Sequence, residues 1–230
     1  MLLLLMGLGL NGCAGSGNGN EFTRFFFDGG WLVWAVLLPL SIVTSQQIVQ
    51  NFLTIRKDIL LPPELLNRLK TPADDQNHRQ HTLKILDQDD CVLSRSIQAA
   101  LSQNGNDQAV MENALTEKIE QESSSLLRKI EWLNIIGNVA PMVGLFGTVW
   151  GMINAFNRIL ETAGQPDPAD LAGGISTALL TTWWGMLVAI PALTAHGLLR
   201  NRIDHLADSI ATEGEAVIKK IHKQTPTHQS

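Results

Sequence analysis

The charged residues of the chain are separated by three long stretches that contain no Asp, Glu, Lys or Arg. These stretches cover residues 29–55, 132–157 and 171–199. Each is longer than the roughly 18 residues at which an apolar segment becomes a candidate for a helix that crosses a bilayer. We therefore predict three transmembrane helices, at residues 31–53, 130–160 and 173–199.

The segment between the first two spans, residues 54–129, has the pattern of a helical region. Two prolines before a glutamate at residues 62–64 are typical of a helix start. Apolar residues then keep a helical spacing over residues 78–103. The Asn-Gly-Asn sequence at residues 104–106 is typical of a break in a helix.

Two of the spans are predicted to continue as helices beyond the membrane. A new apolar spacing begins at Met111 and enters the second span with no Gly or Pro before Gly137. Apolar residues follow heptad-like steps from Leu199 to Ile221, directly after the third span. Both patterns favour long helices whose polar parts pack together outside the bilayer.

Lys and Arg gather on one side of every predicted span. On that side lie Arg56, Lys57, Arg128, Lys129, Arg200 and Arg202, and on the other only Arg24 and Arg158. Because Lys and Arg are enriched in cytoplasmic loops, we predict that residues 54–129 and 200–230 are cytoplasmic and residues 21–30 and 161–172 external. The predicted fold is an all-α integral membrane protein with its amino terminus outside, its carboxyl terminus in the cytoplasm, and its second and third transmembrane helices extended into the cytoplasm.

Residues 1–20 have the character of a leader and not of a fold element. An apolar run from Met1 to Leu10 precedes small and polar residues, as in a secretory signal, although no Lys or Arg comes before the run. The sequence Leu10-Asn-Gly-Cys13 is similar to a lipoprotein cleavage site. A signal peptide without lipid and a lipoprotein-like leader are both open at this point.

Composition excludes several other classes of function. The sequence has no basic face suited to a nucleic-acid partner, and its formal net charge of −5 indicates little about a membrane protein. The two cysteines, Cys13 and Cys91, are predicted on opposite sides of the membrane and belong to no metal-ligand cluster. Ser176 lies far along its helix from His196, so we expect no catalytic pair. We predict a protein that is not an enzyme and has neither a metal site nor a cofactor.

Small residues recur along one stripe of the second span. At steps of four and three, this stripe contains Gly137, Pro141, Gly144, Thr148, Gly151 and Ala155. The third span has a similar face, with Ala178, Thr182, Gly185 and Ala189. Small faces let helices approach closely in lipid, where packing depends on contact and not on the expulsion of water. Both spans are therefore expected to pack within an assembly.

Hydroxyl groups lie at membrane depth on the same two spans. Thr148 lies in the middle of the second span, and Thr177 and Thr181 form a pair one turn apart in the third. A threonine hydroxyl in a helix often bonds only to the carbonyl one turn back. Several threonines facing one place favour a polar path instead, because polar groups in a membrane usually point to a protein interior or a wet cavity.

Two motifs in these spans resemble a known family. The sequence Val143-Gly-Leu-Phe-Gly-Thr-Val-Trp-Gly151, followed by Asn154-Ala-Phe156, is similar to the second-span signature of the MotA/TolQ/ExbB proton-channel family. Residues 178–192 resemble its third-span signature, and residues 27–30 resemble the opening of its first span. The likeness runs from about residue 25 to residue 202 and is nearest to the ExbB/TolQ branch.

The resemblance implies the stator of an ion-driven motor in the inner membrane. In that family, three-span subunits form a pentamer around two copies of a single-span partner of the ExbD/TolR type, whose transmembrane Asp takes up and releases the proton. By analogy, Thr148 and Thr182 line the path, with Thr181 and Thr177 beside them. The residues expected to pack the helices are Gly144, Gly147, Gly151, Pro141, Ala178, Gly185 and Pro191.

One position departs from the family pattern. The ExbB/TolQ branch usually has a glutamate where this chain has Thr177, and no acidic residue lies between Asp170 and Arg200. The transported ion is open between two candidates. One is H⁺, carried by the carboxylate of the partner, and the other is Na⁺, coordinated by threonine oxygens. A third alternative is a non-conducting oligomeric scaffold in the lipid bilayer.

Overall fold

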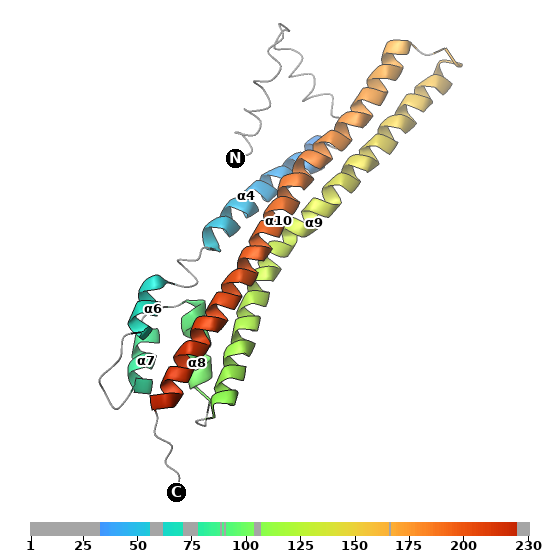
Figure 1. Cartoon of the computed structure of the whole chain (residues 1–230). Coiled ribbons are helices and arrows are strands. Elements are labelled where there is room, and N and C mark those ends of the chain that lie inside the picture. Colours follow the sequence, from blue (N-terminus) through green and yellow to red (C-terminus); the bar gives the residue numbers. More distant parts are fainter. Residues whose placement is uncertain are drawn as a thin grey trace. The chain divides into compact units, whose positions relative to one another are not determined.

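The computed structural model describes residues 33–55, 62–70, 78–87, 89, 91–103, 107–165 and 167–224. Every regular element in these ranges is a helix (Figure 1). Three of the helices are long and apolar enough to cross a membrane: Val33–Thr54, Gln108–Glu161 and Pro168–Ile221. The prediction of an all-α protein with three long apolar helices is therefore confirmed. The leader with Cys13, the external segment 21–30 and the motif at residues 27–30 lie outside the described residues.

The first long helix begins with a π-helical turn, η1 (Val33–Leu37), and continues as α4 (Leu38–Thr54). Pro39 has no N–H to donate to the carbonyl four residues earlier, so the α-helical hydrogen bonding is interrupted where the π turn gives way to α4. Polar side chains of α4 bond to their own helix: the hydroxyl of Thr44 donates to the carbonyl of Leu40 at 2.7 Å, and that of Ser45 to Ser41 at 2.8 Å. This local bonding makes hydroxyls acceptable in an apolar helix.

The other two long helices are α9 (Gln108–Glu161) and α10 (Pro168–Gln224), and a short turn joins them. The predicted uninterrupted helix before residue 137 is confirmed. Gly164 has a positive φ of 86°, and its N–H donates to the carbonyl of Ile159 at 2.9 Å, as at many helix ends. α10 begins at Pro168, where the side chain of Asp167 accepts a hydrogen bond from the N–H of Ala169 at 3.0 Å.

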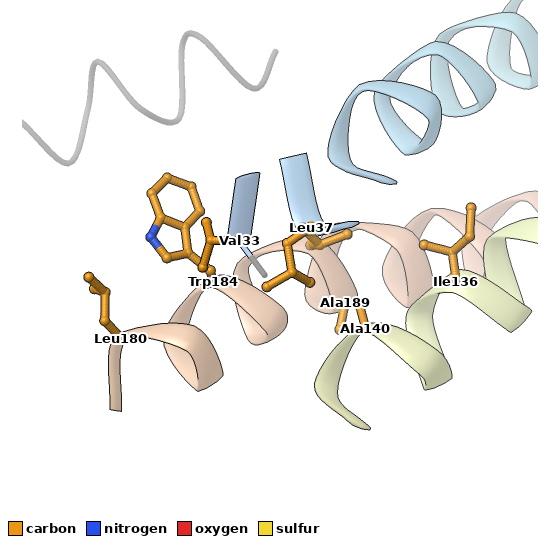
Figure 2. Packing of buried hydrophobic residues seen from close by; sticks show 8 residues of the cluster. Val33, Leu37, Ile136, Ala140, Leu180, Trp184 and Ala189 are labelled. Atoms are coloured by element: carbon orange, nitrogen blue, oxygen red, sulfur yellow. The ribbon is translucent and has the colours of Figure 1, made fainter. Parts of the chain in front are cut away.

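The chain divides into two compact units, which we describe separately. Of the described residues, those within 33–50 and 131–197 form the first unit, and those within 51–130 and 198–224 form the second. In the first unit, η1, α9 and α10 share a core of buried apolar side chains (Figure 2). Its members are Val33, Leu37, Ile136, Ala140, Leu180, Trp184, Val188 and Ala189. Ala140 and Ala189 contribute small side chains to this core, whereas Trp184 contributes a large one.

The described residues of the second unit form three short helices and parts of α9 and α10. The short helices are α6 (Pro63–Lys70), α7 (His78–Leu86) and α8 (Val92–Leu101). The predicted helix start at the paired prolines is confirmed by α6. Gly214 of α10 lies against the side chain of Leu115, because a Cβ added there would meet a methyl carbon of Leu115 at 2.9 Å.

The helical spacing over residues 78–103 is interrupted in the structure, which forms two helices there and not one. Cys91 is the N-cap of α8, and its sulfur accepts a hydrogen bond from the N–H of Ser94 at 3.4 Å. The buried hydroxyl of Ser94 donates to the carbonyl of Leu86 at the end of α7. These side chains satisfy backbone groups at the two helix ends. The helix can therefore break between α7 and α8 although the apolar spacing continues.

Candidate functional site

The backbones of α9 and α10 come into direct contact within the first unit. A Cβ added at Gly144 would lie 2.9 Å from the Cα of Thr182, and one added at Gly185 would lie 2.7 Å from the carbonyl oxygen of Ala140. Real Cβ atoms do not come this close to backbone atoms. Only glycine at these two positions permits the observed separation of the helices.

The same contact continues along the two helices. A Cβ added at Gly147 would meet the side chain of Thr181 at 2.5 Å, and one at Gly151 would meet the Cβ of Ala178 at 2.7 Å. Every glycine and alanine in the predicted packing set therefore lies at this contact between α9 and α10. Pro141 and Pro191 are half-buried inside the same helices. The small stripe of the second span thus serves packing within one chain.

Two threonine hydroxyls of α10 lie near a single backbone carbonyl of α9. Thr181 is 4% exposed, and its Oγ1 lies 3.2 Å from the carbonyl oxygen of Gly144 and 2.7 Å from that of Ala178. The hydroxyl of Thr182 also donates to the carbonyl of Gly144, at 3.2 Å. The glycine contact between the helices therefore also contains two threonine hydroxyls that reach one carbonyl.

The other two predicted path residues lie apart from this carbonyl. Thr148 of α9 is half-buried and donates to the carbonyl of Leu145 at 2.7 Å. Thr177 is half-buried too. Because an α-helix turns about 100° per residue, Thr177 and Thr182 are separated by about 140° around α10. The structure therefore brings Thr181 and Thr182 together at Gly144, whereas Thr177 lies one turn from Thr181 and on a different face of α10 from Thr182.

Among the described residues of the first unit, Glu131 lies within α9, and the other carboxylates, Glu161, Asp167 and Asp170, lie at the turn between α9 and α10. Arg158 and Asp170 form an exposed ion pair at 3.9 Å beside the turn between α9 and α10. Between Asp170 and Asp204, α10 contains no Asp or Glu. Thr181 and Thr182 consequently contribute hydroxyl oxygens beside the carbonyl of Gly144, and α10 contributes no carboxylate there. Among the residues that the structure describes, no three His, Cys, Asp or Glu side chains could hold a metal ion together.

Sequence reasoning missed a row of polar side chains on α9. The amide of Asn134 donates to the carboxylate of Glu131 at 2.9 Å, and the amide of Asn138 donates to the side-chain oxygen of Asn134 at 3.0 Å. The signal that could have revealed this row is the spacing of three and four residues between polar side chains in an otherwise apolar helix.

Known proteins are similar to this chain over the region that contains the two motifs. The profile of the MotA/TolQ/ExbB proton channel family matches residues 85–212. The biopolymer transport protein ExbB of Neisseria meningitidis serogroup A is 32% identical over 187 residues, which cover 73% of this chain and 80% of that protein. The Tol-Pal system protein TolQ of Pseudomonas aeruginosa is 38% identical over 121 residues, which cover 50% of this chain and 52% of that protein.

A third relative, the biopolymer transport protein exbB1 of Vibrio cholerae, is 32% identical over 108 residues, or 47% of each chain. The chain thus matches about half the length of the Pseudomonas and Vibrio proteins and most of the Neisseria protein. The resemblance to the ExbB/TolQ branch is confirmed, and the family is one of channels and not of enzymes. With three long apolar helices and this match, the chain is a multi-pass inner-membrane protein that belongs to the MotA/TolQ/ExbB proton channel family.

Proposed function

We propose that the chain is the channel-forming stator subunit of an ion-driven energy-transducing complex. The observation that carries this proposal is the group of hydroxyls at the glycine contact between α9 and α10, inside two helices that are otherwise apolar. Polar side chains at membrane depth are costly and usually face a protein interior or a wet path. Thr148 and Thr182 would line this path, with Thr181 and Thr177 beside it.

The chain alone lacks a group that carries a proton through this region. Its threonines do not ionise, and α10 has no carboxylate between Asp170 and Asp204. We infer that a single-span membrane protein of the ExbD/TolR type supplies a transmembrane Asp. Protonation removes the charge of such a carboxylate and lets it pass an apolar interface that excludes the charged form. One charge that moves through 100 mV releases about 2.3 kcal/mol, which is available for mechanical work.

The outer face of α9 supports an assembly of several copies. Large apolar side chains remain exposed on it, among them Leu145 (61%), Phe146 (57%) and Trp150 (47%). Since the glycine stripe already contacts α10, other subunits would pack against these large side chains or against lipid. We propose a homo-oligomer, a pentamer by analogy with the family, around the single-span partner.

The orientation in this proposal follows the positive-inside rule. Residues 54–129 and 200–230 would be cytoplasmic, and the amino terminus would be external. α9 and α10 would then extend from the membrane into the cytoplasm. Ions would flow inward, from the turn between these helices toward the end of the bilayer near Arg128 and Lys129.

Two alternatives have support from a specific observation. The missing carboxylate of α10 favours a non-conducting scaffold, and the oxygen atoms near Gly144 favour a sodium-driven stator. We favour protons because hydroxyl oxygens alone do not select an ion.

The first test is the mass of the intact complex. The full chain would be produced with a single-span, Asp-bearing membrane protein encoded beside it and examined by native mass spectrometry. Five copies with two partners would support the stator, whereas a stable assembly that never retains a partner would favour the scaffold.

The second test is ion flux through that complex in proteoliposomes, with pH-sensitive and sodium-sensitive dyes inside. Thr148→Val should abolish flux and leave the assembly intact, because valine keeps the shape of threonine and removes the hydroxyl. Full flux in this variant would refute the path through Thr148. The dye that responds would identify the ion.

A further inference from the structure

The row of polar side chains at the start of the membrane part of α9, which we name the α9 ladder, consists of Glu131, Asn134 and Asn138. Oε1 of Glu131 accepts from Asn134 at 2.9 Å, and Oδ1 of Asn134 accepts from Asn138 at 3.0 Å. The amide of Asn138 is also 2.8 Å from the backbone carbonyl of Asn134. One carboxylate and two amides thus form a connected chain of hydrogen bonds along the helix.

The α9 ladder lies on a different face from the contact with α10. That contact uses Ala140, Gly144 and Gly147, all of which are buried. Glu131 and Asn138 are exposed. At about 100° per residue, Asn138 is separated from Ala140 by about 160° around the helix. The third long helix of the chain therefore does not cover the α9 ladder.

The surroundings of the α9 ladder are apolar. Ile135, Val139 and Met142, on the same exposed side of α9, are 44%, 42% and 69% exposed. Amides in contact with hydrocarbon would cost several kcal/mol each unless they were hydrogen-bonded. The two bonds within the α9 ladder satisfy only part of the capacity of these groups, because each amide has two donors and an acceptor. Water on this face would satisfy the remaining donors and acceptors.

Thr148 lies further along α9 from the α9 ladder. Continuing from Asn138 in steps of three, four and three residues gives Pro141, Leu145 and Thr148. In a straight α-helix this seam drifts around the axis, so Thr148 is about 80° from Asn138 and about 40° from Gly144 of the α10 contact. Asn138 and Thr148 are separated by about 15 Å along the axis, at a rise of about 1.5 Å per residue. Apart from Leu145, the seam from Glu131 to Thr148 has no large apolar side chain.

We propose that the α9 ladder lines a water-filled cation path and that Glu131 is the cation-binding carboxylate of this subunit. This inference rests on the proposed function and adds a residue role to it. The transported cation would meet the carboxylate at the end of the path near Arg128 and Lys129. Oε1 of Glu131 accepts the hydrogen bond from Asn134, and the side chain of Glu131 is exposed, so its second oxygen can be reached by a cation. The carboxylate missing from α10 thus has a counterpart on α9.

The first experiment measures whether water reaches the α9 ladder. Asn134→Cys and Asn138→Cys would be introduced into the full chain with Cys13→Ser and Cys91→Ser, co-produced with the single-span partner in membrane vesicles. A membrane-impermeant methanethiosulfonate would be applied from the cytoplasmic side. Ile135→Cys and Val139→Cys are the matched controls, since each lies one position from a residue of the ladder.

Labelling at residues 134 and 138 should be at least about tenfold faster than at the controls, because only a hydrated thiol ionises readily. Equal rates at all four positions would overturn the proposed wet path.

The second experiment measures the role of the charge. Glu131→Gln retains an oxygen that accepts from Asn134 and removes the negative charge. We expect ion flux through the reconstituted complex to fall about tenfold, since charges at membrane depth govern ion passage. Glu117→Gln, at an exposed position of α9 in the second unit, is the control and should keep full flux.

Unchanged flux in Glu131→Gln, together with loss of flux in Thr148→Val, would overturn this inference and leave the proposed function standing. If the complex with all native residues conducts no ion, the proposed function fails, and the inference that rests on it fails as well.

Discussion

Thr182 and Gly144 meet at the point where the backbones of α10 and α9 are in contact. The hydroxyl of Thr182 donates to the carbonyl of Gly144 at 3.2 Å, and a Cβ on Gly144 would be 2.9 Å from the Cα of Thr182. Helix packing and the candidate ion path therefore share one position. Changes at these residues need readouts that separate assembly from conduction.

We expect Gly185→Ala to destabilise the protein by about 1–3 kcal/mol, the usual cost of overpacking. The added methyl would lie 2.7 Å from the carbonyl oxygen of Ala140, so the two helices would have to separate. Thermal unfolding in detergent would measure the effect. Gly173→Ala is the matched control on the same helix, because nothing lies within 4 Å of its added Cβ. A similar fall in both variants would contradict the steric explanation.

Thr181→Val and Thr182→Val should differ in what they impair. Thr181 is 4% exposed and bonded between the helices, so its loss should lower stability by about 0.6–2 kcal/mol. Thr182 is half-buried beside the proposed path, so its loss should reduce ion flux more than stability. Unfolding and flux measured on the same preparations would compare the two. Equal loss of flux in both would place Thr181 in the path as well.

Ser94→Ala should destabilise the second unit by about 1–3 kcal/mol. The buried hydroxyl of Ser94 donates to the carbonyl of Leu86. Alanine would remove this donor and leave the carbonyl without that hydrogen bond. Hydrogen exchange at the end of α7 would report the local opening. Ser102→Ala removes an exposed hydroxyl that bonds to Ala99 and should have little effect. A large effect of the control would contradict this account.

Cys91 should react slowly with iodoacetamide in the folded protein. Burial raises the pKa of its thiol above the ordinary value of 9.0, and the nearby Asp89 raises it further. A raised pKa means less thiolate at any given pH, so alkylation should be slower than for the unfolded chain, and its rate should still be rising with pH above 9.0, where the rate of the unfolded chain levels off.

The same shift makes the free energy of unfolding fall as pH rises above 9.0, because the folded state keeps the proton longer. Mass spectrometry of alkylated protein across pH, with and without denaturant, would check the reactivity. Equal rates in both states would contradict it.

The sequence was sufficient to predict the three long helices, because charged residues are absent over whole bilayer lengths and no Gly or Pro interrupts α9 before Gly137. It was not sufficient to place the break after Leu86, since apolar spacing continues across it while Cys91 and Ser94 satisfy the helix ends. Side-chain caps of this kind leave no trace in the periodicity of apolar residues.

The residues of the candidate site could be predicted from the sequence, but their positions relative to one another could not. The four threonines were expected near one place, but helix geometry puts Thr177 and Thr182 on different faces, and Thr181 is buried between α9 and α10. The small stripe was expected to admit other helices of an assembly, and in the structure α10 of the same chain lies against it. The sequence indicates that close packing occurs, but it does not identify the partner helix.

The glycine contact also limits how this protein can change over evolutionary time. At Gly144 and Gly185, even a methyl group would meet backbone atoms, so no other residue type fits without moving a helix. The outer face of α9, where Phe146 and Trp150 are exposed, has no such restriction from within the chain. Related machines that drive different loads are therefore expected to diverge on their outer faces around an invariant helix pair.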